Sequence, residues 1–355
     1  MLGGIILLSA FVYRNSFSSR FFQDDRIAMD MANSGDWLAT VPGVNHYRPV
    51  TIQLFYGLSQ NFFGLNPVGY HLVEFAAYCL TIFFIYALLK KILKDGGKAM
   101  TGTFIYALNV SLFGNFYWIA TSYFSIGALF FFAASYLYLR SGKAAAALTL
   151  LTLAIAILSN ELALTLPFIF LALSWYFGFR PKRLIGSFAL AGLYFFAKLK
   201  LIGMPQVSDY SYSFNSQVLA TARWYFLRAF NLPEGVRFSA DPLIPGLFLV
   251  FLILIAVAIG HYFFREGTRI KVFLLAGAWF GAAALPFFFL PMHMSAYYLT
   301  MALFSPALLA GEVISVGWLR AITLPVYLWL TVAGLEFLSR THWIILKNTG
   351  PIGKF

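Results

Sequence analysis

The sequence is poor in charge, because Asp, Glu, Lys and Arg together make up 11% of its 355 residues. Soluble domains contain about 25% of these residues, so the chain falls outside the soluble globular class. It has a single cysteine, Cys79, which excludes a framework of disulfides. It also lacks a Walker loop, a GxGxxG fingerprint, a nucleophile elbow and an HExxH helix, so no motif supports nucleotide hydrolysis or zinc proteolysis.

Apolar and aromatic residues dominate instead, with 61% hydrophobic residues and a mean hydropathy of +0.78. A helix needs about 20 mostly apolar residues to cross a bilayer. We therefore predict an all-α polytopic membrane protein with about 11 transmembrane helices in one integral-membrane domain, 1–355. The first predicted span is short, and 143–178 can also be read as one re-entrant unit. The predicted spans are 1–14, 67–92, 99–118, 121–139, 143–159, 161–178, 183–202, 242–264, 270–290, 294–316 and 318–338.

Two long polar stretches, 15–66 and 203–241, interrupt the apolar pattern, and the distribution of Lys and Arg predicts on which side they lie. If the amino terminus is cytoplasmic, every inside loop carries a cation, whereas the short outside loops 114–122, 159–160 and 291–293 carry none. Both long loops are then extracytoplasmic, in the inner or plasma membrane of a prokaryote. The net charge of +12 thus reflects membrane orientation and not nucleic-acid binding. The inside cations are Lys90, Lys91, Lys94, Lys98, Arg140, Lys143, Arg180, Lys182, Arg183, Arg265, Arg269, Lys271 and Arg320.

The first loop carries an adjacent acidic pair, Asp24 and Asp25. The apolar residues that follow have helical spacing and predict a short helix over 26–34 that lies in the membrane interface. An Asp before such a helix is a preferred N-cap, which explains one carboxylate. The second carboxylate calls for another explanation, and a general base that deprotonates an acceptor hydroxyl is one.

Four further ionisable residues stand near the predicted outer ends of the spans. His71 and Glu74 are three residues apart on one helical face inside the second span, where they either satisfy each other or take part in catalysis. As an HxxE pair they would also supply two ligands to a divalent metal, but nothing in the sequence completes the set. Glu161 and His293 occupy outer turns, where Glu161 also suits the first turn of a helix.

Four cations are candidates for binding a phosphate group at the same membrane face. Arg48 stands beside the acidic loop and is followed by Pro49, and Lys198 lies near the outer end of the seventh predicted span. Arg223 and Arg228 belong to an aromatic-rich helix of the second loop. Arg binds phosphate through paired hydrogen bonds, although cations at this depth also snorkel to lipid headgroups.

Several motifs together resemble the GT-C superfamily of integral-membrane glycosyltransferases. The likeness is strongest to the protein O-mannosyltransferase-like branch, including the transmembrane O-mannosyltransferases that carry tetratricopeptide tails. It covers most of residues 20–300. The matching motifs are Phe22-Gln23-Asp24-Asp25, Tyr47-Arg48-Pro49-Val50, Asn66-Pro67-Val68-Gly69-Tyr70-His71-Leu72, Ser159-Asn160-Glu161-Leu162-Ala163-Leu164-Thr165-Leu166-Pro167, and Leu232-Pro233 through Ser239-Ala240-Asp241.

The resemblance implies a polyprenyl-phosphate sugar donor, a glycan, lipid or protein acceptor, and a first-loop aspartate as the base. Carried onto this sequence, the base is Asp24 or Asp25, with Asp24 favoured and Asp25 as its supporting neighbour. The sequence departs from the branch where Asn160 replaces a common Lys, Glu74 a common Asn, and His293-Met294 a common Glu-Arg-Tyr run, and no tetratricopeptide tail is present. Acceptor-side roles then fall to His71, Glu74, Glu161 and His293, and donor-phosphate roles to Arg48, Lys198, Arg223 and Arg228.

Two other classes of function compete with this reading. A transporter or flippase for lipid or polysaccharide predicts paired repeats whose helices break near the membrane midplane, and no such internal symmetry is visible. A polysaccharide ligase or polymerase would place its essential residues mainly in the second long loop. Whether the two long loops face one lipid-accessible cavity distinguishes these alternatives.

Overall fold

The computed structural model describes residues 1–41, 43–179, 184–236, 242–265, 269–314 and 316–349. This part of the chain is built of α-helices joined by short 3₁₀ and π segments, and its one described β contact is an isolated bridge between Val41 and His46. The sequence motif at 239–241 and the predicted cytoplasmic cations Arg180, Lys182 and Arg183 lie outside the described residues.

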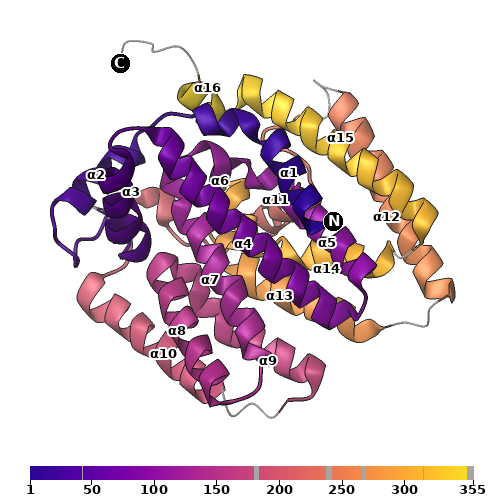
Figure 1. The fold of residues 1–355 in the computed structure, drawn as a ribbon, viewed down its shortest axis with the longest axis horizontal. Helices are drawn as coiled ribbons and strands as arrows, with labels where there is room; N and C mark the ends of the chain where they lie inside the picture. Colours follow the sequence, from indigo (N-terminus) through magenta and orange to yellow (C-terminus); the bar gives the residue numbers. More distant parts are fainter. Residues whose placement is uncertain (42, 180–183, 237–241, 266–268, 315, 350–355) are drawn as a thin grey trace.

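Figure 1 shows long helices packed side by side, with α2 and α3 set apart at one end. The α-helices are α1 (Leu2–Val12), α2 (Asp24–Asn33), α3 (Gly57–Phe63), α4 (Pro67–Leu93), α5 (Gly96–Ala107), α6 (Phe113–Tyr117), α7 (Ser122–Tyr138), α8 (Lys143–Ser159), α9 (Leu166–Phe177), α10 (Leu184–Ala197), α11 (Gln217–Ala229), α12 (Leu243–Arg265), α13 (Ile270–Phe288), α14 (Phe304–Val313), α15 (Gly317–Thr341) and α16 (Trp343–Thr349).

Six helical segments of the described part are long and apolar enough to cross a membrane, which agrees with an integral membrane protein. Three more apolar segments are shorter, and α1 is one of them. At 1.5 Å per residue, the 11 residues of α1 span about 16 Å, roughly half of the hydrocarbon thickness. The six long segments are Pro67–Leu93, Ile119–Tyr138, Leu184–Ile202, Leu243–Phe264, Ile270–Phe288 and Gly317–Thr341.

Two of the predicted spans are not continuous helices. In the predicted span 99–118, α5 ends at Ala107, because the Asn109 side chain accepts the N–H of Ser111 at 2.9 Å and starts a new 3₁₀ turn. The predicted span 294–316 likewise divides into a 3₁₀ turn and α14. Every predicted span thus corresponds to helical structure, while the count of eleven crossings stays a prediction.

The central helix α4 begins and ends where its sequence dictates. Asn66 caps it by accepting the N–H of Val68 at 3.1 Å, and Pro67 fills the first turn, where a missing N–H costs nothing. Lys94 ends it in the left-handed region at φ +59°, and Asp95 caps the next helix, α5. Helix α4 packs against α5 and α7, so it joins the first loop to the body of the bundle.

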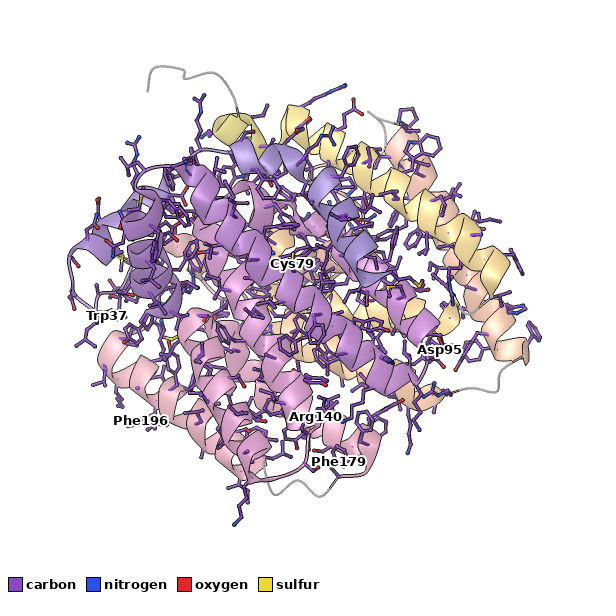
Figure 2. The ribbon with its side chains drawn as sticks, viewed as in Figure 1. Trp37, Cys79, Asp95, Arg140, Phe179 and Phe196 are labelled. Atoms are coloured by element: carbon purple, nitrogen blue, oxygen red, sulfur yellow. The ribbon has the colours of Figure 1, made fainter. Side chains whose placement is uncertain are left out.

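The predicted cytoplasmic cations gather at one end of the bundle. Lys91 Nζ donates to the carbonyl of Leu139 at 2.7 Å, which joins the ends of α4 and α7. Buried Glu312 binds Arg269 at 3.3 Å and Lys98 at 3.7 Å, which joins α14 to α5 and to the start of α13. Figure 2 shows Asp95 and Arg140 well away from Trp37 of the first loop. The two long loops therefore share the end of the bundle that the predicted inside cations leave free.

At the loop end, the predicted interfacial helix is α2. It begins at Asp24, two residues before the predicted start, so both acidic residues lie in its first turn and Gln23 occupies the N-cap position. Neither aspartate is therefore the N-cap residue, which corrects that expectation. Helix α2 packs against η2 (Val50–Tyr56), a π-helical segment that continues directly into α3.

Candidate functional site

A cavity of about 650 Å³ lies at the loop end of the bundle. Its walls come from both long loops, from the outer ends of α7 and α8, and from α9, α10 and α13. One part of the wall is apolar and rich in phenylalanine, including Phe168, Phe188 and Phe287. The other part is ionic and holds His46, Arg48, Glu161 and Lys198. The two long loops thus face one cavity.

Glu161 is the centre of the ionic part. Its Oε2 accepts from Arg48 Nε at 2.8 Å and lies 3.5 Å from His46 Nδ1, while its Oε1 lies 3.5 Å from Lys198 Nζ. Local structure explains its position, because Asn160 ends α8 and its side chain accepts the N–H of Leu162 at 3.0 Å. This cap starts a fresh turn and directs Glu161 towards the two loops.

Arg48 is held on two sides. Its guanidinium stacks on the ring of Tyr123 at 3.9 Å and binds Glu161. Burial opposes its charge, but the pairing with Glu161 outweighs burial and raises the pKa of Arg48 above its usual range. Arg48 is therefore a fixed positive charge in the cavity wall at any physiological pH.

Lys198 reaches the same cluster from α10. Its Nζ donates to the carbonyl of Asn45 in the first loop and lies beside Glu161. It begins a π-helical turn, Lys198–Ile202, and is buried, whereas Lys200 in the same turn is exposed. Counting Arg48 and Lys198 against Glu161, the cluster carries one net positive charge when His46 is neutral.

Hydrogen bonds join the two long loops beside the cavity. Gln206 donates its N–H to the carbonyl of Gly43 at 2.9 Å, and the side chain of Asn45 donates to the carbonyl of Met204 at 2.9 Å. Further along, Ser213 donates its N–H to Phe289 at the end of α13. The stretch 203–215 is therefore fastened at both ends across the cavity.

Tyr210, within this stretch, packs between two histidines, edge-on to His46 and tilted against His293. Its ring lies 5.6 Å from His46 and 4.2 Å from His293, measured between ring centroids. Burial lowers the pKa of both imidazoles, and the charge of Arg48 lowers the pKa of His46 further. His46 was not predicted from sequence. Its position two residues before Arg48, in Asn45-His46-Tyr47-Arg48, was the available signal.

The acidic pair separates into one exposed and one buried carboxyl. Asp25 is fully buried, and its Oδ1 accepts from the hydroxyl of Tyr56 at 2.7 Å. Asp24 retains solvent exposure, and partial burial raises its pKa. The pKa of Tyr210 is raised by burial and, among smaller contributions, by the charges of Asp24 and Glu161. Neither Asp24 nor Asp25 is among the residues that line the large cavity.

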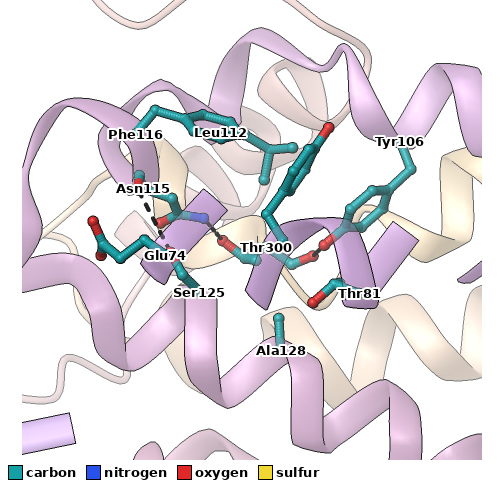
Figure 3. A pocket seen from close by; sticks show the side chains of 10 residues that line it. Glu74, Thr81, Tyr106, Leu112, Asn115, Phe116, Ser125, Ala128 and Thr300 are labelled. Carbon is teal, nitrogen blue, oxygen red and sulfur yellow. Dashed lines mark hydrogen bonds between the residues drawn. The ribbon is translucent and has the colours of Figure 1, made fainter. Parts of the chain in front are cut away.

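His71 and Glu74 form a buried pair beneath the acidic turn. His71 Nδ1 lies 3.6 Å from Glu74 Oε2, and His71 Nε2 contacts the carbonyl of Ser19 at 3.2 Å. Glu74 also borders a separate cavity of about 20 Å³, room for one water molecule, which Asn115 borders as well (Figure 3). Asn115 there donates to the hydroxyl of Thr300 at 2.7 Å. This pair is separate from the residues that line the large cavity.

The two arginines of α11 do not line the large cavity. Arg223 is exposed, whereas Arg228 is buried with its guanidinium 4.4 Å from the ring of Trp224. Burial lowers the pKa of Arg228 to about 10, although the charge of Glu234 opposes this shift. The structure thus brings Arg48 and Lys198 together at the cavity and leaves Arg223 and Arg228 apart from them.

Metal ligands are the next feature that the structure tests. Among the residues that the structure describes, no group of three or more His, Cys, Asp or Glu side chains is arranged to hold a metal ion. The HxxE pair of His71 and Glu74 therefore stays two ligands short of a typical structural zinc site.

Comparison with known proteins adds a likeness at the level of the fold. No protein-family model and no curated protein matches the sequence. Among solved structures, the chain is similar to ArnT from Cupriavidus metallidurans, which was crystallised bound to undecaprenyl phosphate. The TM-score is 0.56 at 13% sequence identity, over 95% of this chain and 63% of ArnT. The chain thus spans less than two thirds of the length of that protein. The likeness shows that this chain has an ArnT-like fold.

Proposed function

We propose that this chain is a glycosyltransferase that moves a sugar from a polyprenyl-phosphate donor to an acceptor at the extracytoplasmic face of the membrane. The observation that carries the proposal is the large cavity, in which a phenylalanine-rich wall adjoins a cluster with one net positive charge. An isoprenoid chain is apolar and its phosphate is anionic, so the two parts of the wall match the two parts of such a donor. The likeness to ArnT, a protein solved with undecaprenyl phosphate, supports the same substrate class.

Each member of the site has a distinct task in the proposed reaction. Arg48 and Lys198 bind the donor phosphate and stabilise the negative charge that grows on it as it leaves. The acceptor oxygen forms a bond to the anomeric carbon while the bond between that carbon and the phosphate oxygen breaks. Asp24 takes the proton of the acceptor hydroxyl, and polyprenyl phosphate departs. Glu161 holds Arg48 and Lys198 in place through its two carboxylate oxygens. His293 lies on the acceptor side, beside Tyr210.

The finer assignment to the protein O-mannosyltransferase-like branch rests on the sequence motifs. Arg48 of the motif Tyr47-Arg48-Pro49-Val50 lines the cavity, whereas Phe22-Gln23-Asp24-Asp25 belongs to the same loop and does not line it. Asn160 and His293 depart from that branch, and both border or adjoin the cavity. We therefore propose a related transferase whose acceptor differs from that of the branch.

Loss of the Lys198 charge is expected to weaken donor binding. Removing a charge-assisted hydrogen bond costs about 1.5–3 kcal/mol, so Lys198→Ala should raise the Kd for undecaprenyl phosphate by roughly 10- to 150-fold. Binding to the purified protein is measured by competition with a fluorescent polyprenyl phosphate. Lys200→Ala is the matched control, because Lys200 is exposed in the same turn and should leave the Kd unchanged. Equal affinities for both variants would contradict the phosphate site, and Arg223→Ala in the same assay tests the separate cluster on α11.

Sidedness gives an independent prediction, motivated by the cations gathered at the opposite end of the bundle. In a Cys79→Ala background, cysteines at Ser34 and Ser211 should react with an impermeant thiol reagent in intact cells, because both positions are exposed in the long loops. Cysteine at Ser141, which is exposed in the turn between α7 and α8, should react only after the cells are lysed. The reverse labelling pattern would place the site on the cytoplasmic side.

A further inference from the structure

We propose that Tyr56 is a positioning residue for the base: its hydroxyl fixes the ionised carboxylate of Asp25, and Asp25 in turn fixes the turn that carries Asp24. This inference rests on the proposed function, because it explains how the base is held for transfer. It also makes sugar transfer depend on the ionisation of a second, buried carboxyl that does not touch the substrate.

Two short contacts define the arrangement. The Tyr56 hydroxyl donates to Oδ1 of Asp25 at 2.7 Å, and Oδ2 of Asp25 accepts the N–H of Phe22 at 2.6 Å. Asp25 is 0% exposed and Tyr56 is 1% exposed, so water does not compete for these bonds. Buried hydrogen bonds to a charged group are the strong ones, and each is costly to leave unmade.

The turn needs such a clamp because its backbone is in an unfavourable conformation. Gln23, between Phe22 and Asp24, has φ +40° and ψ −94°, a region that residues with a Cβ rarely adopt. Residues in such a strained conformation persist only where contacts from the surrounding structure hold them in place. Asp25 does this by closing on Phe22 twice, since its side chain accepts the Phe22 N–H and its own N–H donates to the Phe22 carbonyl at 2.9 Å. The direction of Asp24 therefore depends on Asp25.

Tyr56 also connects the base to the ionic cluster. It is the last residue of the π-helical segment η2, which begins two residues after Arg48. Along this segment, Thr51 donates its hydroxyl to the carbonyl of Ser159, two residues before Glu161. One short element thus begins two residues after Arg48 and ends at Tyr56, which supports the turn that carries Asp24. π-Helical turns are rare and are frequent at functional sites.

Ionisation of Asp25 falls within the physiological pH range. Burial raises its pKa to about 7, although the hydrogen bonds from Phe22, Tyr56 and the N–H of Ala120 oppose this shift. The charge of Asp24 raises the pKa of Asp25 slightly further. Tyr70 and Glu74 of α4 are the other titratable groups that face it.

The direction of the pH effect follows from these contacts. Above about pH 7 the ionised carboxylate accepts from both Tyr56 and Phe22, whereas protonation removes one acceptor position and loosens the turn. The pKa of Asp25 in the folded protein lies above its pKa in the unfolded chain, so the free energy of unfolding falls as pH rises through about 7. Activity increases over the same pH range. The acid limb of the pH profile should then report Asp25 and not the base itself.

The test compares Tyr56→Phe with Tyr70→Phe. Tyr70 lies in the same aromatic cluster, with its ring 5.8 Å from that of Tyr56, but its hydroxyl donates to the carbonyl of Gly64 and not to Asp25. Tyr56→Phe should move the acid limb of kcat up by about one to two pH units and lower turnover at pH 7 roughly 10-fold, with donor affinity unchanged. Tyr70→Phe should leave the limb in place. A Tyr56→Phe variant whose limb stays at the parental pH would overturn the proposal.

A second measurement separates this inference from the proposed function. Infrared titration of the carboxyl band of Asp25, identified by its loss in Asp25→Asn, requires no turnover. The band should titrate near pH 7 in the parent and at higher pH in Tyr56→Phe. An unmoved band would overturn the clamp even if sugar transfer is confirmed. A shifted band would support the clamp even in a protein that transfers no sugar.

Discussion

Replacing Asp24 by asparagine is expected to abolish sugar transfer while leaving the fold and donor binding intact. General acid–base catalysis contributes about 100- to 10,000-fold to a rate, so turnover should fall by about 100-fold or more. The side chain is exposed at the start of α2 and makes no hydrogen bond that holds the structure described here. Its replacement should therefore remove a proton acceptor and little else. Turnover and the Kd for undecaprenyl phosphate are measured separately.

Two control variants sharpen this result. Asp30→Asn removes an exposed carboxylate from the same helix and should keep parental turnover. Asp25→Asn differs in kind, because the amide would place an N–H₂ group against either the Phe22 N–H or the Tyr56 hydroxyl and so loosen the turn. If the Asp24→Asn variant transfers sugar at the parental rate, the assignment of Asp24 as the base is wrong.

The second large effect is expected on stability, from Arg48→Ala. Removing one partner of a fully buried ion pair costs about 3–5 kcal/mol, because the remaining charge is left uncompensated. The Arg48–Glu161 pair is only partly buried, with side chains 12% and 17% exposed. Glu161 would keep Lys198 and His46 as partners at 3.5 Å, so the loss should lie near the lower end of that range. Thermal unfolding in mild detergent reports the change, and Arg26→Ala, at an exposed position of the first loop, is the control.

A double variant tests the cause of this loss. Glu161→Gln keeps the shape of the side chain and removes its charge. The double variant Arg48→Ala with Glu161→Gln should lose less stability than the sum of the two single losses, although Lys198 is then left without its carboxylate partner. Strictly additive losses would show that Arg48 stabilises the fold through packing on Tyr123 and not through the ion pair. Donor binding should stay weakened in both Arg48→Ala and the double variant, because both lack the guanidinium that binds the phosphate.

Sequence patterns predicted the local structure well because local signals act over a few residues. Asn66-Pro67 marked the start of α4, and the apolar spacing after Asp25 marked α2 within two residues. The same patterns did not reveal which helices reach full membrane length. The break after α5 depends on Asn109, whose side chain also donates to the carbonyl of Ala229, 120 positions away.

The site required information that no spacing contains. Arg48 and Glu161 are 113 positions apart, and their contact arises where the first loop folds over the turn between α8 and the following 3₁₀ segment. Lys198 and Arg223 looked equivalent in sequence, since both are cations near outer helix ends. The fold buries Lys198 beside Glu161 and leaves Arg223 exposed on α11. His46 was missed because a lone histidine in a loop has no periodic pattern to mark it.

Helix α10 makes the two halves of the cavity physically unlike. Only 17% of its most apolar window, within Leu184–Ile202, is buried inside the protein, against 72% for Ile119–Tyr138, and Phe196 points outward from it (Figure 2). The ionic part of the wall is therefore formed by the polypeptide alone, whereas the apolar part is completed by the lipid or detergent molecules that surround α10. For the proposed donor, selection among phosphate groups should then be a property of the purified protein, and selection among tail lengths should depend on both protein and bilayer. Affinities for short-chain and long-chain donors should be compared in lipid nanodiscs of defined thickness, because detergent replaces one of the binding partners.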